Sequence, residues 1–185
     1  MSGAKLRLHL GCGKRYIPGF THVDRADFPH IDHRQDIRSL ANFPDESAEL
    51  VYACQVIDYF DLIDLPDVFA EWKRVLMPGG ILRLSVPNFA TIARLYQAGL
   101  SLDWMLGTLY GRWPDGNGGW IYKKTTFDEP ALSKILGDAG FVDVEVWDWR
   151  LTDHAAYDDF SQAYFPHMEK ERGILWNLNM QARKP

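Results

Sequence analysis

The chain has 185 residues, of which 46% are hydrophobic and 24% are charged, and its formal net charge is −5. This length allows one domain with a sizeable core and excludes two full ones. The acidic balance argues against a nucleic-acid partner, which normally requires a basic face. No apolar run is long enough to cross a bilayer and the N-terminus lacks the apolar core of a signal peptide, so we expect a cytoplasmic protein with no membrane span.

The first predicted element is a strand over residues 6–10 that ends in a glycine loop, because its leucines repeat with period two. Gly11 and Gly13 let the backbone turn sharply and let a ligand approach main-chain N–H groups. A dinucleotide fingerprint would need a third glycine where Tyr16 stands, and a P-loop would need a Gly-Lys-Ser/Thr ending. The loop therefore favours a small polar ligand over a phosphate chain, with an ordinary glycine turn as the alternative.

The next three predicted strands end in polar residues. Residues 20–24 form a short strand that ends in Asp24, and residues 30–36 form a loop and a short strand closed by Asp36. The interval after the glycines is too short for a full crossover helix, so at most one turn fits there. Residues 48–54 read as a largely buried strand.

An amphipathic helix is predicted after Pro66, with apolar residues recurring on one face until the Pro78-Gly79-Gly80 turn ends it. A strand over residues 81–86 follows. A helix between strands implies parallel pairing with right-handed crossovers. Residues 90–110 are mostly helical, with a break at Gly99.

The last part of the chain begins with a predicted loop over residues 111–120 that carries two tryptophans. A helix should run from an N-cap at Asp128 to a stop at Gly140. Residues 141–147 are predicted to form a strand with valines on one face. Residues 148–173 show no helical or strand periodicity, and residues 174–182 are predicted to form a closing strand. The two cysteines do not make a disulfide framework, and no His, Asp or Cys set has a recognised metal-ligand spacing, so no metal is expected.

Taken in order, these motifs resemble a known family. Residues 8–13, the acids Asp24 and Asp36, residues 55–60 and residues 74–80 recur as in the class I S-adenosylmethionine-dependent methyltransferases of the compact type 11 kind. The resemblance covers residues 5–147. It implies an α/β fold, in which a doubly wound, mostly parallel, seven-stranded Rossmann-like sheet has an antiparallel final strand. We expect a single domain over residues 1–185, with cap segments over about residues 100–125 and 148–173.

The resemblance also implies S-adenosyl-L-methionine as the cofactor and S-adenosyl-L-homocysteine as its product. The glycine loop would meet the methionine carboxylate, and the acid that ends the second strand would bind the ribose hydroxyls. The residues after the third strand would face the adenine, and those after the fourth would line the floor beside the sulfonium. The predicted cofactor-binding residues are Leu10, Gly11, Cys12, Gly13, Asp24, Arg25, Asp36, Ile37, Gln55 and Val56.

The chain departs from the family pattern at three places. His9 stands where an acid is usual, so any contact that this acid makes with the cofactor must come from elsewhere. The helix after the glycine loop is curtailed, which weakens any helix-dipole contribution. Relatives often have His-Val-Leu-Glu-His where this chain has residues 55–59, Gln-Val-Ile-Asp-Tyr.

The chemistry requires alignment of nucleophile, carbon and sulfur more than a fixed catalytic residue. Candidate bases are Asp58, Tyr59, His154 and His167. The candidate acceptor-binding residues, from the two cap segments, are Trp113, Trp120, Tyr122, Tyr164 and His167. This mixture of aromatic and polar groups suits a small-molecule or glycan-linked acceptor, such as a sugar in polysaccharide biosynthesis. A non-catalytic protein of the same fold and a nucleotide binder are the alternatives, and the oligomeric state is left open.

Overall fold

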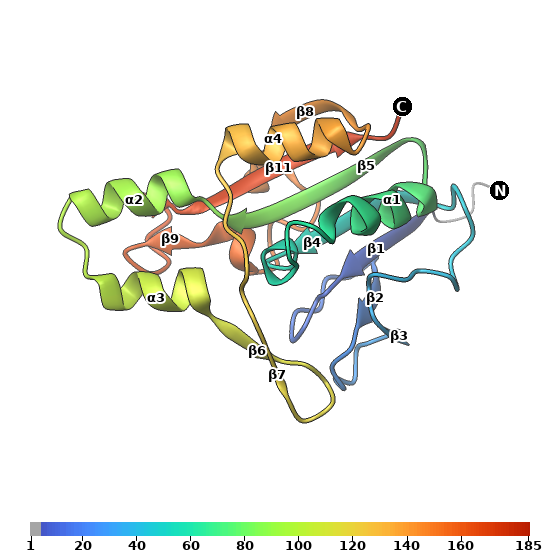
Figure 1. The fold of residues 1–185 in the computed structure, drawn as a ribbon, viewed down its shortest axis with the longest axis horizontal. Coiled ribbons are helices and arrows are strands. Elements are labelled where there is room, and N and C mark those ends of the chain that lie inside the picture. The colour runs from blue at the N-terminus through green and yellow to red at the C-terminus, as the bar shows by residue number, and fades with distance from the viewer. Residues whose placement is uncertain (1–4) are drawn as a thin grey trace.

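A seven-stranded sheet forms the centre of the computed structural model, which describes residues 5–185 (Figure 1). Its strands, in spatial order, are β3 (His33–Arg34), β2 (Thr21–Asp24), β1 (Leu6–Leu10), β4 (Ala48–Cys54), β5 (Leu76–Pro87), β11 (Asn177–Arg183) and β8 (Val142–Val146). The pairs from β3 to β5 are parallel, and β11 is antiparallel to both of its neighbours. The predicted fold class is therefore confirmed.

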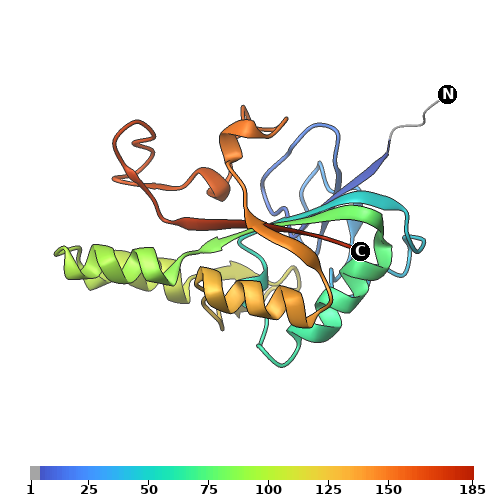
Figure 2. The same ribbon diagram turned by 90° about the horizontal axis from the view of Figure 1, so that it is seen from above.

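The helices are α1 (Leu65–Val75), α2 (Phe89–Gln97), α3 (Leu102–Tyr110) and α4 (Glu129–Asp138). Figure 2 shows α1 and α4 on one face of the sheet, whereas the segment between β8 and β11 covers the other face. That segment consists of loops, short 3₁₀ turns and the two short strands β9 (Tyr164–Phe165) and β10 (Ile174–Leu175). Figure 1 shows α2 and α3 extending beyond the end of β5.

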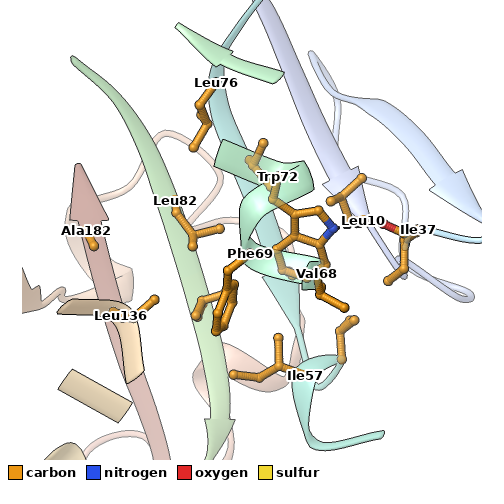
Figure 3. Packing of buried hydrophobic residues seen from close by; sticks show 14 of the residues in the cluster. Leu10, Ile37, Ile57, Val68, Phe69, Trp72, Leu76, Leu82, Leu136 and Ala182 are labelled. Atoms are coloured by element: carbon orange, nitrogen blue, oxygen red, sulfur yellow. Dashed lines mark hydrogen bonds between the residues drawn. The ribbon is translucent and has the colours of Figure 1, made fainter. Parts of the chain in front are cut away.

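The larger part of the core lies between the sheet and α1 and α4 (Figure 3). The predicted apolar face of α1 is buried, with Phe69 and Trp72 fully enclosed. Trp72 also donates a hydrogen bond from Nε1 to the carbonyl of Ile37, 2.8 Å away, and so fixes the segment after β3. The helix ends at Val75 and β5 begins at the next residue, before the turn that was predicted to end the helix.

The capping signals of α4 are confirmed. The Asp128 carboxylate accepts a hydrogen bond from the Ala131 N–H at 2.9 Å, as an N-cap side chain should. Phe127 and Leu132, on either side of the cap, are both buried. Gly140 follows the helix with a φ of +76°, the left-handed conformation that ends many helices.

Two predicted segments differ from the structure. The prediction of a loop over residues 111–120 is wrong, because β6 (Arg112–Pro114) and β7 (Trp120–Tyr122) form an antiparallel hairpin. The Asp115 carboxylate accepts hydrogen bonds from the N–H groups of Asn117 and Gly119, each at 2.8 Å, and these bonds form the hairpin turn. The closing strand over residues 174–182 is also split, because β10 (Ile174–Leu175) pairs with β9 (Tyr164–Phe165) instead of joining β11.

The valines of β8 do not form a buried face. Val142 and Val146 are 42% and 55% exposed. The reason is local: Asp143 has a φ of +50°, and the pairing with β11 shifts register between Gln181 and Arg183. This bulge interrupts the regular alternation along the edge strand, and of its three valines only Val144 packs against the core.

Among residues 5–185, no helix combines the length and apolarity that a bilayer crossing needs. The same residues contain no group of three or more His, Cys, Asp or Glu side chains arranged to hold a metal ion. Cys12 and Cys54 are both free thiols.

Candidate functional site

A cavity of about 1070 Å³ opens at the carboxyl ends of β1, β2 and β4. This is the edge at which open α/β sheets bind ligands. Of the predicted cofactor residues, the cavity wall includes all but Leu10, whose side chain is fully buried in the core. The wall residues from that set are Gly11, Cys12, Gly13, Asp24, Arg25, Asp36, Ile37, Gln55 and Val56.

The glycine loop is fixed by the carboxylate that ends β2. Asp24 accepts hydrogen bonds from the N–H of Gly13 at 2.7 Å and from the N–H of Ala26 at 2.8 Å. The Gly11 N–H donates to the carbonyl of Val23 at 2.8 Å. The amides of both glycines thus have partners within the protein, and a ligand carboxylate would have to displace those bonds. Asp24 keeps acceptor capacity, since a carboxylate has about four lone-pair sites.

Asp36 and Ile37 lie beside this loop. The Asp36 carboxylate receives hydrogen bonds from Nε and Nη2 of Arg38 at 3.0 and 2.6 Å. Partial burial raises the pKa of Asp36, but the hydrogen bonds from Arg38 outweigh it and hold that pKa below its usual value. An added Cβ on Gly11 would lie 2.6 Å from Val56 and 3.5 Å from Ile37, so these three residues converge at one end of the cavity.

A buried ion pair forms the floor of the cavity after β4. Nζ of Lys123 lies 2.9 Å from Oδ2 of Asp58 and donates a hydrogen bond to Oε1 of Gln55 at 2.6 Å. The two charged side chains are 7% and 1% exposed. Burial raises the pKa of Asp58, and the ammonium of Lys123 opposes that rise. Gln55 itself has a φ of +59°, a strained conformation for a residue with a Cβ.

Comparisons with known proteins agree with this arrangement. A family model described as a methyltransferase domain matches residues 13–84, which contain β2, β4, α1 and most of β5. This is the family that the sequence resembles, and over these residues the match agrees with the predicted class I methyltransferase.

A Mycolicibacterium smegmatis protein named as a probable S-adenosylmethionine-dependent methyltransferase is 38% identical over 72 residues. The match covers 39% of this chain and 27% of the relative, so it spans about a quarter of that curated protein.

Solved structures share the fold at low identity. An S-adenosylmethionine-dependent methyltransferase from Archaeoglobus fulgidus has a TM-score of 0.57 and 14% identity, over 98% of this chain and 87% of that one. The 1,6-didemethyltoxoflavin N1-methyltransferase of Burkholderia thailandensis, solved with its acceptor and S-adenosylhomocysteine, has a TM-score of 0.54 and 14% identity, over 97% and 72% of the chains.

Of the four candidate bases, only Tyr59 lies on the cavity wall. Burial raises the pKa of its phenol, and the nearby charge of Asp58 adds to that rise. Asp58 lies behind Lys123. His154 is buried against Phe20 and Tyr52 on the second face of the sheet, so the structure places it away from the cavity.

The acceptor-binding candidates are also divided. Trp113, Trp120 and Tyr122 line the cavity, although the last two are half exposed. Tyr164 is buried on the second face, where its hydroxyl accepts a hydrogen bond from Arg150 at 2.6 Å. His167 is exposed in the turn between β9 and β10 and does not reach the cavity wall.

Lys123 lies on the cavity wall but was not among the predicted site residues. Trp113, Ile121 and Lys123 share the inward face of the hairpin, but its strands are too short for this alternation to be seen in the sequence. Two further wall residues, Asp159 and Phe160, come from the segment after β8. The Asp159 carboxylate accepts hydrogen bonds from the hydroxyls of Tyr52 and Ser161.

Proposed function

We propose that this methyltransferase domain binds S-adenosylmethionine in the cavity and transfers its methyl group to an acceptor held in the same space. The observation that carries the proposal is the convergence of Gly11, Asp24, Asp36 and Val56 on one cavity at the carboxyl edge of the sheet. The volume of about 1070 Å³ is at the top of the usual range of about 300–1,000 Å³ for small-molecule pockets. A cavity of this size is consistent with a cofactor and a small acceptor bound side by side.

Asp24 would bind the ribose hydroxyls with its remaining lone pairs while it continues to hold the Gly13 amide. Asp36 and Ile37 would border the adenine, and Gln55 and Val56 would lie beside the sulfonium. When bound, the cofactor supplies an electrophilic methyl group whose sulfur leaves with the bonding electron pair. The protein contributes alignment and exclusion of water. Because its pKa is raised, Tyr59 remains a phenol near neutral pH and would position the acceptor by hydrogen bonding.

For the acceptor we propose a small molecule or a glycan-linked group, such as a sugar in polysaccharide biosynthesis. The cavity wall also includes aromatic side chains at Trp113 and Phe160 and a carboxylate at Asp159. Such a combination suits a molecule with both flat apolar faces and hydroxyl groups. A small-molecule acceptor is also named for the Burkholderia relative.

The alternative is a protein of the same fold that binds without turnover. Two observations favour it: His9 replaces an acid in β1, and the amides of Gly11 and Gly13 have internal partners. This alternative predicts that S-adenosylmethionine protects the fold against unfolding but yields no methylated product with any acceptor.

Calorimetric titration with S-adenosylmethionine and S-adenosylhomocysteine tests the proposal. Wild type should bind both, and Asp24→Asn should bind at least about tenfold more weakly, a loss of about 1.4 kcal/mol. Asp24→Asn is preferred to Asp24→Ala because it retains one oxygen acceptor for the loop amides. Asp27→Asn, on an exposed neighbouring acid, is the matched control. A wild type that binds neither ligand would refute the proposed function.

A further inference from the structure

The β6–β7 hairpin has an inner face and an outer face. Trp113 and Ile121 pair across it in register and are partly buried, and the Lys123 N–H continues the pairing to the carbonyl of Gly111 at 3.0 Å. The residues between them in the pairing are exposed, although they also border the cavity: Arg112, Pro114, Trp120 and Tyr122. The hairpin thus turns an indole and an ammonium toward the cavity.

The tip of the hairpin contacts the end of β2, and its middle contacts the glycine loop after β1. Gly116 lies so close to Arg25 that an added Cβ would be 2.5 Å from the Arg25 carbonyl oxygen. Nη2 of Arg34, in β3, donates a hydrogen bond to the Gly116 carbonyl at 3.2 Å. In the middle, Trp113 packs against the glycine loop, where an added Cβ on Gly13 would lie 3.1 Å from Cζ2 of the indole.

The end of the hairpin is attached to the segment after β4. Lys123 reaches both Asp58 and Gln55 from β7's extension. The next two residues, Lys124 and Thr125, donate main-chain hydrogen bonds to the Asp58 carbonyl at 2.8 and 3.2 Å. The hairpin therefore crosses the carboxyl edge of the sheet from β4 to β3, as its position in Figure 1 indicates.

We propose that Trp113 is a cofactor-contacting residue and that Lys123 is a positioning residue that holds the hairpin closed over the cofactor. This inference rests on the proposed function. Trp113 touches Gly13 and also lines the cavity, so a ligand bound along the glycine loop meets its indole ring. Opening the hairpin would separate Lys123 from Asp58 and leave a carboxylate buried without its cation, which strongly favours the closed form.

The test measures the dissociation rate of S-adenosylhomocysteine by stopped-flow fluorescence, together with hydrogen exchange of residues 111–124. The variants are Trp113→Ala and the double variant Lys123→Met/Asp58→Asn, in which no buried charge is left alone. Lys123→Arg keeps the cation and should restore slow dissociation in part. The control is Lys134→Met, which breaks the exposed pair with Asp138 on α4.

In the double variant, dissociation should be about tenfold faster and exchange should rise in the hairpin but not in α4. If the closed fraction falls to about one tenth, the apparent affinity falls by the same factor. Trp113→Ala should also release the ligand faster, and Lys134→Met should match wild type. Unchanged dissociation in both variants, with a wild type that binds, would overturn this inference alone. A wild type that does not bind would overturn the proposed function as well.

Discussion

Replacing Gly11 with alanine should destabilise the protein through two separable effects. Gly11 has a φ of +63°, and left-handed backbone costs roughly 1–2 kcal/mol for a residue with a Cβ. The new Cβ would also lie 2.6 and 3.1 Å from the two methyl groups of Val56, and overpacking of this kind costs about 1–3 kcal/mol. We therefore expect Gly11→Ala to lower the free energy of unfolding by about 2–5 kcal/mol.

Gly19→Ala separates the two effects. Gly19 has a φ of +81°, but apart from Gly19 and its two chain neighbours no heavy atom of residues 5–185 lies within 4 Å of its added Cβ, so only the strain of roughly 1–2 kcal/mol applies. Both variants are measured by urea unfolding. The double variant Gly11→Ala/Val56→Ala should lose less than the sum of its single changes, because the smaller side chain removes the clash. Equal losses for Gly11→Ala and Gly19→Ala would refute the reasoning.

Two other predictions concern stability. Burial, followed by the charges of nearby histidines, holds the pKa of His9 well below its usual value. Below about pH 6.5 this histidine is therefore protonated in the unfolded chain but stays neutral in the folded chain. The free energy of unfolding should then fall with decreasing pH by about 1.4 kcal/mol per unit for this group, and His9→Gln should reduce the measured slope; an unchanged slope would contradict the assignment. Asp128→Ala should cost about 1 kcal/mol in thermal or urea unfolding, because the N-cap bond to the Ala131 N–H is lost, whereas the exposed Asp138→Ala should cost less.

Much of the fold could be predicted because its signals are local. The strand over residues 48–54, the cap at Asp128 and the helix break at Gly99 are each set by side chains a few positions apart, and the structure confirms them. The hairpin of β6 and β7 could not be predicted in the same way. Its strands have three residues each, too few for a period to be seen, and the turn residues between them are typical of an ordinary loop.

The same distinction between local and distant signals applies to the residues of the functional site. Gly11, Asp24 and Val56 lie at or just after the carboxyl ends of strands, so the parallel strands bring them to one edge and they line the cavity. The depth of Lys123 could not be read from the sequence, because a buried lysine depends on a partner acid, Asp58, that is distant in the chain. His167 illustrates the opposite error, since a polar residue in an insertion can point away from the site that the insertion covers.

The two outer strands of the sheet have a consequence for how copies of the chain meet. An exposed edge offers free N–H and C=O groups to any other strand, and long flat edges promote aggregation. β3 contains only two residues, and β8 is bent at Asp143, whose carboxylate lies 3.5 Å from Arg183. Neither edge gives a second molecule a straight row of partners. The bulge at Asp143 therefore makes this edge a poor template for a strand of another molecule.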